Sequence, residues 1–397
     1  MLRTKGMLLN MVFDLQGNID MTILNNADLC KTFNVNKIFL KAMTLPEHTD
    51  PLFVPELNSN YVFDEKILNQ VLLFLADPSH DCLFLSGASG CGKTSLILQI
   101  ASRLNYPVQS ITVSNKTEIQ DLIGHPVLKN GSLSFEYGAL TNAMLKGEIL
   151  LINEIDMIGA GELSALNDVL EGKPLVIVQN KGEVIKPHKN FRVIATGNTK
   201  GNGDETGFYN GARILNKAFL DRWRFIECTY TSKDNEINII KKANPNLTDD
   251  EVDKLCTLSY EIRRVSGGAD AVGISTPFST RTLLRIAHLF ASIDISIYEA
   301  VEMGFSSRLV TLEHDYIDRL TKDIFGNSYV RKSKVADPVV ITDTVKIEPA
   351  VTEIVKVKKT RKTTKKASKA VKPENDTNSE HEPHQGFLEF VNDPLTA

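Results

Sequence analysis

The 397-residue sequence predicts an α/β domain with a parallel sheet covered by helices on both faces, then a small all-α lid domain and a disordered tail. Short apolar strands alternate with amphipathic helices up to about residue 230. Residues 233–326 are helical in pattern almost throughout, and from residue 331 the apolar pattern stops. The chain is therefore divided into an N-terminal segment at 1–60, the α/β domain at 61–230, the lid domain at 231–330 and the tail at 331–397.

A glycine-rich loop at residues 87–94 is the centre of the predicted α/β domain. It matches the spacing G-x-x-x-x-G-K-[ST], which is typical of loops that bind phosphates. Residues 82–86 before it predict a short buried strand, and residues 95–101 after it predict an amphipathic helix. The expected nucleotide-binding residues are Gly87, Ala88, Ser89, Gly90, Cys91, Gly92, Lys93, Thr94, Ser95 and, further along the chain, Asn153.

Each residue type in this loop suits a nucleoside triphosphate. Glycines let the chain curl so that several backbone N–H donors converge on the phosphates. Lys93 supplies a positive charge for the β- and γ-phosphates, and the hydroxyl of Thr94 is a ligand for Mg²⁺. The N-terminus of the following helix adds a partial positive charge. The sequence therefore predicts binding of ATP and Mg²⁺.

Hydrolysis also needs an acidic side chain that positions water, and the strand at 149–152 supplies one at its end. Glu154 fits the base that polarises the attacking water. Asn153 stands where hydrolases of this type usually have Asp, so its carbonyl can accept a bond from a Mg²⁺-bound water without the strengthening charge. We expect weaker metal retention and slow turnover. Asp156 is a candidate to compensate, although its position better suits the start of the next helix.

Three polar residues further along the chain complete the expected site. Asn198 follows the apolar stretch 191–197, where it can touch the γ-phosphate or its water. Arg222 and Arg281 offer planar guanidinium groups that match the spread charge of a phosphoryl group in transfer. In isolation each arginine is an ordinary surface ion-pair residue. Their order behind the loop and the acidic strand end favours the catalytic interpretation.

Two predicted hairpins interrupt the alternation of strands and helices. Residues 126–135 centre on Asn130 and Gly131, a strong hairpin signal. Residues 175–178 and 183–185 form the second hairpin. Neither hairpin is needed to hold a nucleotide, so both are candidates for a surface that grips another molecule.

The order of these features resembles the MoxR-like group of AAA+ ATPases, and within it the CobS-type ATPase subunits of aerobic cobaltochelatase. The most specific stretch runs from Ile185 through Gly201–Gly211 to Trp223. The resemblance extends from about Phe33 to Gly326 and leaves out both termini. It implies an AAA+ nucleotide domain and a helical lid.

The resemblance also implies roles for individual residues. Asn198 corresponds to the sensor-1 residue, and Arg281 to the sensor-2 arginine of the lid. Arg222 corresponds to the arginine finger that reaches the nucleotide of a neighbouring subunit, with Arg224 as a second candidate. Asn153 departs from the aspartate that the family has at this position, which affects the expected hydrolysis rate more than ATP binding.

A finger that acts on a neighbour implies a ring, usually a homo-hexamer. The two hairpins correspond to the helix-2 insert and the pre-sensor-1 hairpin, which mark the substrate-facing side of the group. Members typically act with a partner that has a von Willebrand A domain. In cobaltochelatase the metal and corrin chemistry resides on other subunits, and the eight histidines here are too dispersed to predict a cobalt site.

Composition bounds the environment of the protein. The formal net charge is −4, and the five cysteines are scattered without C-x-x-C spacing, which is typical of free thiols in a reducing cytoplasm. No apolar run reaches the roughly 18 residues that a membrane span requires. We therefore expect a cytoplasmic protein without membrane contact.

The tail contains a basic block, Lys356–Lys372, that cannot bury a core and is predicted to be disordered. It is either a tether for nucleic acid or an acidic partner, or a solvated linker. Two alternatives to a protein-remodelling ATPase stay open at this point. One is a DNA-associated motor or accessory factor that uses this block. The other is a nucleotide-gated scaffold in which Asn153 has weakened hydrolysis.

Overall fold

The computed structural model describes residues 10–13, 19–45, 50–79, 81–204, 207, 209, 211–266 and 273–327. The predicted tail at 331–397, including Lys356–Lys372, lies outside these residues. Within the described ranges, every helix is too short or too polar to cross a membrane.

Five parallel strands form the central sheet in the order β12-β4-β11-β8-β5. Their bounds are β4 (Cys82–Ser86), β5 (Val108–Thr112), β8 (Ile149–Asn153), β11 (Arg192–Gly197) and β12 (Trp223–Glu227). The strands predicted at 82–86 and 149–152 are confirmed to within one residue. Both are buried along their whole length because helices cover both faces of the sheet.

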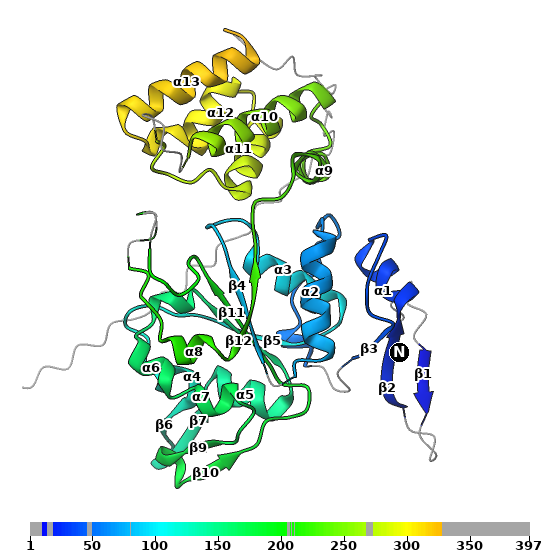
Figure 1. Ribbon diagram of the computed structural model, residues 1–397, viewed down its shortest axis with the longest axis vertical. Helices are drawn as coiled ribbons and strands as arrows, with labels where there is room; N and C mark the ends of the chain where they lie inside the picture. The colour runs from blue at the N-terminus through cyan, green and yellow to red at the C-terminus, as the bar shows by residue number, and fades with distance from the viewer. Residues whose placement is uncertain are drawn as a thin grey trace, which may run out of the picture. The chain divides into compact units, whose positions relative to one another are not determined.

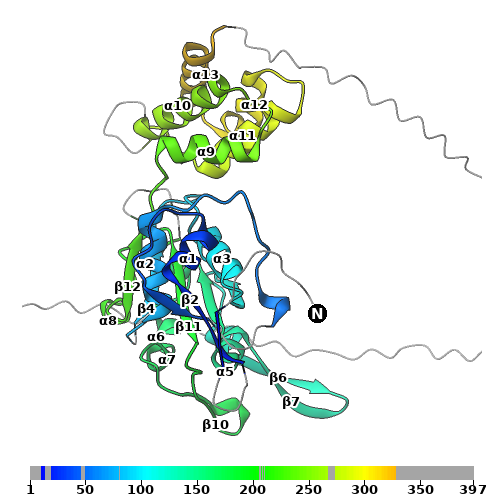
Figure 2. The same ribbon diagram turned by 90° about the vertical axis from the view of Figure 1, so that its right-hand side faces the viewer.

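Successive side chains of β4 enter two different cores, since they point to opposite faces of the sheet. Leu83 and Leu85 pack with α2 (Glu65–Ala76) and α3 (Lys93–Arg103). Phe84 belongs to the other core. The helices that contribute to that core are α4 (Ile119–Ile123), α5 (Ala139–Lys146), α6 (Ala160–Ser164), α7 (Asn167–Leu170) and α8 (Lys217–Leu220). The predicted helices on both faces are thus confirmed (Figures 1 and 2).

The N-terminal segment has structure that its sequence pattern did not indicate. A three-stranded antiparallel sheet contains β1 (Asn10–Phe13), β2 (Ile19–Asn25) and β3 (Ala42–Thr44), and α1 (Asn26–Phe33) lies between the last two strands in the chain. Leu24, Leu29 and Met43 are buried in the same core as α2. Their burial depends on a helix distant in sequence, so local periodicity was a weak signal.

Both predicted hairpins are confirmed. The first joins β6 (Gly124–Lys129) to β7 (Ser132–Tyr137), and the second joins β9 (Leu175–Ile177) to β10 (Glu183–Ile185). Asn130 and Gly131 both have positive φ, at 51° and 77°, as a two-residue hairpin turn favours. The hydroxyl of Tyr137 donates to Glu183 at 2.7 Å and so joins the two hairpins. Figure 2 shows the β6–β7 ribbon extending away from the sheet.

The predicted helical region is also confirmed. Its helices are α9 (Lys233–Ala243), α10 (Asp249–Val265), α11 (Thr280–Ser292), α12 (Ile297–Gly304) and α13 (Thr311–Phe325). They share a core of their own around Phe278, Phe290 and Phe305. The domain boundaries at residues 60, 230 and 330 stay predictions.

Candidate functional site

Three neighbouring strands bring the predicted polar residues together at their carboxyl ends. β11 lies between β4 and β8, and Gly197 at the end of β11 pairs with Ser86 at the end of β4. The chain runs from β4 into the glycine-rich loop, from β8 into Asn153 and Glu154, and from β11 into Asn198. Because the strands are parallel, these three exits are adjacent, which is where α/β sheets bind ligands.

The first and last glycines of the loop have backbone conformations that other residues rarely adopt. Gly87 has a φ of 149°, and a Cβ at this position would lie 2.0 Å from the carbonyl oxygen of Cys228. Gly92 has a φ of 102° and precedes α3. Among the described residues no side chain caps this helix end. The N–H groups of its first turn are therefore available for an anion.

Lys93 is only 8% exposed and holds the loop from inside. Its Nζ donates to the carbonyl oxygens of Gly87 at 2.5 Å and Ala88 at 3.1 Å. It also donates to Oδ1 of Asn198 at 3.1 Å. Burial lowers the pKa of Lys93. Two residues predicted from separate stretches of sequence, Lys93 and Asn198, are thus in direct contact.

Thr94 and Asn153 are also in contact. The Thr94 hydroxyl donates to Oδ1 of Asn153 at 2.7 Å, and Nδ2 of Asn153 donates to the Ser110 hydroxyl at 3.0 Å. This arrangement turns the amide oxygen of Asn153 toward Thr94. Oxygen atoms are the ligands that Mg²⁺ prefers, and the ion usually keeps several waters. The hydroxyl and amide oxygens therefore fit a Mg²⁺ site, although neither is charged.

Glu154 follows β8 in a left-handed backbone conformation, with φ 59° and ψ 44°. For a residue other than glycine this conformation costs about 1–3 kcal/mol. Its N–H donates to the Thr196 hydroxyl at 3.3 Å, which ties it to β11. The residue is exposed at the same strand edge as the loop. A strained acidic residue at this place suits the role of a base for water.

Asp156 lies at the start of the helical turn after β8, as its position in the sequence favoured, and its side chain has a further role that the sequence did not indicate. It lies in a 3₁₀ turn (Ile155–Met157) and is 1% exposed. Its Oδ2 accepts bonds from the N–H groups of Asn198 and Thr199, both at 2.9 Å, and from the Thr199 hydroxyl at 3.0 Å. A buried carboxylate needs such donors, and the turn after β11 supplies them. Asp156 therefore anchors the backbone that positions Asn198.

Arg222 lies at the amino ends of the parallel strands, whereas the phosphate loop of the same chain lies at their carboxyl ends. β12 runs parallel to β4, and Trp223 pairs with Cys82, the first residue of β4. The loop begins five residues later, after roughly 16 Å of strand at about 3.3 Å per residue. The Nε of Arg222 donates to Glu171 at 2.8 Å. The structure therefore does not bring Arg222 to the other candidate residues of its own chain.

Arg224, the second candidate for the finger, is engaged within its own chain. Its guanidinium group pairs with Asp81 at 3.0 Å and donates to the carbonyl oxygen of Pro78 at 3.2 Å. It also lies 5.9 Å from the ring centre of Phe74. Arg222 is likewise bonded within its own chain, to Glu171 and to the carbonyl oxygen of Ala218.

Arg281, in contrast, lies near the loop of its own chain. It is the second residue of α11, whose N-cap is Ser279. A Cβ added to Gly90 would lie 2.5 Å from Cβ of Ser279 and 3.8 Å from Cβ of Arg281. The start of α11 is therefore in contact with the phosphate loop.

A cavity of about 490 Å³ beside the loop was not predicted from the sequence. Tyr61, Val62 and Ile67 line one part of it and Leu284 another. The loop residues Gly90, Cys91, Gly92 and Ser95 also line it, together with Arg281. Burial raises the pKa of Tyr61 to about 12, and its side chain bonds Ser95. A largely apolar cavity next to a phosphate loop suits a nucleotide base. The stretch 58–67 contains no motif that could have revealed it.

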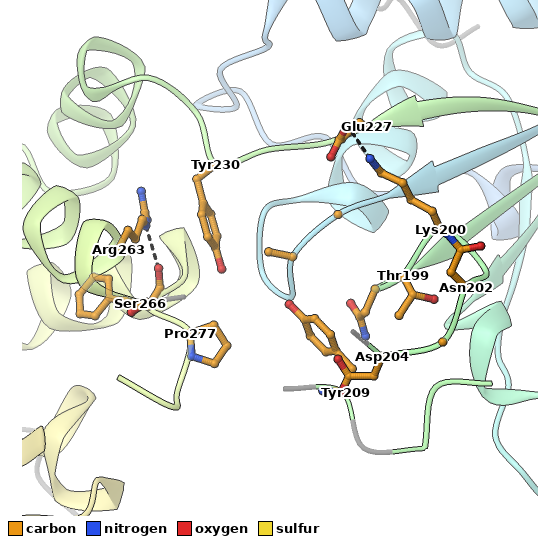
Figure 3. Close-up of a pocket in the computed structure, with 15 residues that line it drawn as sticks. Thr199, Lys200, Asn202, Asp204, Tyr209, Glu227, Tyr230, Arg263, Ser266 and Pro277 are labelled. Atoms are coloured by element: carbon orange, nitrogen blue, oxygen red, sulfur yellow. Dashed lines mark hydrogen bonds and ion pairs between the residues drawn. The ribbon is translucent and has the colours of Figure 1, made fainter. Parts of the chain in front are cut away.

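Two tyrosines that the sequence did not single out as site residues hold Ser89. The N–H of Ser89 donates to the Tyr209 hydroxyl at 3.1 Å, and the Tyr230 hydroxyl donates to the carbonyl oxygen of Ser89 at 3.0 Å. Both tyrosines line a second cavity of about 570 Å³, which also includes Asn198 (Figure 3). Tyr209 lies in the stretch that is most specific to the family resemblance. That location was the only sign in the sequence that Tyr209 belongs to the site.

Comparison with known proteins agrees with this geometry. Residues 82–222 match the AAA domain of the dynein-related subfamily. The sheet order, the loop and the strand-end residues are those of an AAA+ domain, and the chain resembles the MoxR-like group of AAA+ ATPases. It is 29% identical to the aerobic cobaltochelatase subunit CobS of Sinorhizobium sp over 325 residues, 79% of this chain and 95% of that protein. The predicted resemblance is confirmed.

Two further relatives each match slightly more than half of the chain. The chain is 25% identical over 209 residues to the protein NorQ of Paracoccus denitrificans, which is 52% of this chain and 74% of NorQ. It is 23% identical over 253 residues to von Willebrand factor A domain-containing protein 8 of Mus musculus. That match spans 57% of this chain and 13% of the mouse protein.

Proposed function

We propose that this protein forms a ring, hydrolyses ATP with Mg²⁺ between its subunits, and uses the reaction to remodel a protein partner. The observation that supports this most directly is the position of Arg222. Four candidate residues lie at the carboxyl ends of the strands, namely Lys93, Thr94, Glu154 and Asn198. Arg222 lies at the amino ends. An arginine in that position acts on a phosphate only if the phosphate belongs to a neighbour.

The residues of one subunit would divide the work on ATP as follows. Lys93 exchanges its bonds to two loop carbonyls for bonds to the phosphates. Glu154 orients the attacking water and acts as the general base that accepts its proton. Asn198 forms a hydrogen bond with that water or with the γ-phosphate. Thr94 would hold Mg²⁺ with its hydroxyl, and Asn153 would help to hold it with its amide oxygen. When bound, Mg²⁺ offsets the charge of the phosphoryl group in transfer.

For the partner, we propose a protein with a von Willebrand A domain. The mouse relative, by its name, has such a domain in the same chain as the matching segment. The hairpins offer a surface for the partner, because Leu128, Leu133 and Val176 are 74%, 76% and 53% exposed. The relative CobS is by its name a subunit of a cobaltochelatase, so a chelatase-type complex is the proposed setting. The five free cysteines support a cytoplasmic location.

Mixing two inactive variants tests the shared site. Glu154→Gln removes the proposed base, and Arg222→Ala removes the proposed finger. In a one-to-one mixture of full-length chains, an Arg222→Ala subunit next to a Glu154→Gln subunit regains a complete site. We expect phosphate release to recover to about a quarter of the wild-type rate, the share of such pairs in random rings. Arg224→Ala serves as the control and should keep most activity.

Failure of the mixture to recover activity, with both variants assembled into rings, would contradict the shared site. Steady hydrolysis by the wild-type chain that Glu154→Gln abolishes would rule out the scaffold alternative. The DNA-associated alternative depends on Lys356–Lys372, outside the described residues, and no feature of the site favours it.

A further inference from the structure

Tyr230 connects the phosphate loop to the helical region by contacts that the proposed mechanism does not use. It lies in the segment between β12 and α9, and its hydroxyl donates to the carbonyl oxygen of Ser89 at 3.0 Å. The guanidinium group of Arg263 in α10 lies over its ring, 4.2 Å from the ring centre. Figure 3 shows Tyr230 beside Arg263. The same side chain thus touches the loop at its hydroxyl and the helical region at its ring.

Arg263 continues the connection through a buried ion pair. One of its terminal nitrogens donates to Oε1 of Glu236 at 2.8 Å, and the two side chains are 15% and 3% exposed. Oε1 of Glu236 also accepts from the Thr280 hydroxyl at 2.8 Å, and Oε2 accepts from Ser259 at 2.9 Å. The Nε of Arg263 donates to the carbonyl oxygen of Phe278 at 2.8 Å. Because both carboxylate oxygens of Glu236 accept hydrogen bonds, the buried ion pair of Arg263 and Glu236 favours one geometry.

This network ends at the residues next to the proposed lid arginine. Thr280 is the first residue of α11 and Arg281 the second. Phe278 and Thr280 flank Ser279, the N-cap that contacts Gly90 of the loop. A shift of the loop at Ser89 would therefore act on the start of α11 through Tyr230, in addition to the direct contact.

We propose that Tyr230 is a positioning residue that sets Arg281 according to the conformation of the phosphate loop. The proposal rests on the proposed function, since it assigns Arg281 to the nucleotide. Tyr230 acts through Arg263 and Glu236 and has no chemical step of its own. Its effect on ATP should therefore require Arg281.

A double-mutant cycle in the full-length chain tests this dependence. Tyr230→Phe removes the bond to Ser89 but keeps the ring under Arg263. We expect it to weaken ATP binding about fivefold, the value of one hydrogen bond of about 1 kcal/mol. In an Arg281→Ala background the same change should weaken binding less than about twofold. Displacement of a fluorescent ATP analogue measures affinity without hydrolysis.

Tyr209→Phe is the matched control, because Tyr209 holds the N–H of the same Ser89 but belongs to the stretch after β11. Its effect should be the same with and without Arg281. Arg263→Lys keeps the positive charge but loses the planar guanidinium group. It should weaken ATP binding as Tyr230→Phe does. An equal effect of Tyr230→Phe in both backgrounds would overturn the proposal. Absence of wild-type hydrolysis would overturn the proposed function instead, since the binding measurement does not depend on it.

Discussion

The hydroxyl of Thr94 donates to Oδ1 of Asn153 at 2.7 Å, so the residue that departs from the family pattern contacts the hydroxyl that we propose as a Mg²⁺ ligand. Its oxygen is neutral. Asn153→Asp would place a charged oxygen there, which strengthens bonds to Mg²⁺ and its waters. We expect the Mg²⁺ concentration for half-maximal ATP hydrolysis to fall about three- to tenfold. Titration of ATPase activity with Mg²⁺ measures this, and an unchanged midpoint would contradict a metal role for this position.

Asp156 should matter for both stability and catalysis. Asp156→Ala leaves the N–H groups of Asn198 and Thr199 without their acceptor in a buried place. The expected loss in free energy of unfolding is about 2–4 kcal/mol, with kcat reduced at least about tenfold. Asp156→Asn keeps one acceptor oxygen and should lose less than half as much. Urea unfolding and steady-state kinetics give the two values. Equal behaviour of the two variants would show that the acceptor bonds are unimportant.

Glu171 should restrain Arg222 in the free chain. Bonds from Lys173 first, and from Arg222 second, lower the pKa of Glu171, so its charge is retained in mildly acidic solution and lost only as the pH falls below its ordinary range. Glu171→Gln frees the arginine for a neighbouring subunit. We expect higher ATPase activity than wild type at low protein concentration and equal activity at high concentration. Asp168→Asn is the control, because Asp168 pairs with Lys173. A matching rise in that control would contradict the specific restraint.

Gly87 should not tolerate a side chain. Gly87→Ala combines a φ of 149° with a contact of 2.0 Å to Cys228, so the loop must move. We expect loss of ATP binding and a stability loss of more than about 3 kcal/mol. Gly131→Ala is the matched control, since Gly131 also has positive φ, at 77°, but no atom within 4 Å of the added Cβ. It should cost roughly 1–2 kcal/mol and leave ATP binding intact. Calorimetry and nucleotide titration compare the two.

Sequence reasoning worked best where a local rule applies. The glycine-rich loop, the strand ends before Asn153 and Asn198, and the hairpin at Asn130 depend on neighbours within a few residues. Burial in β4 and β8 follows from continuous apolar runs. These features were therefore predictable before any tertiary contact was known.

The contacts of Asp156, Tyr209 and Tyr230 could not be read in the same way. Each joins residues more than 40 positions apart, and each depends on which strands are neighbours. Asp156 illustrates this, because a carboxylate two residues after a strand has several ordinary roles. The pairing of β8 with β11 selects the one in which it holds Asn198.

The sequence by itself determined that the chain has a phosphate loop followed by an acidic strand end, because short-range spacing sets that chemistry. Only the tertiary structure decided which candidate residues lie at the same end of the parallel strands. Parallel pairing of β12 with β4 separates Arg222 from its own loop, while the start of α11 returns Arg281 to it. The physical reason is that strand order and helix packing result from burial across the whole domain, which no local pattern encodes.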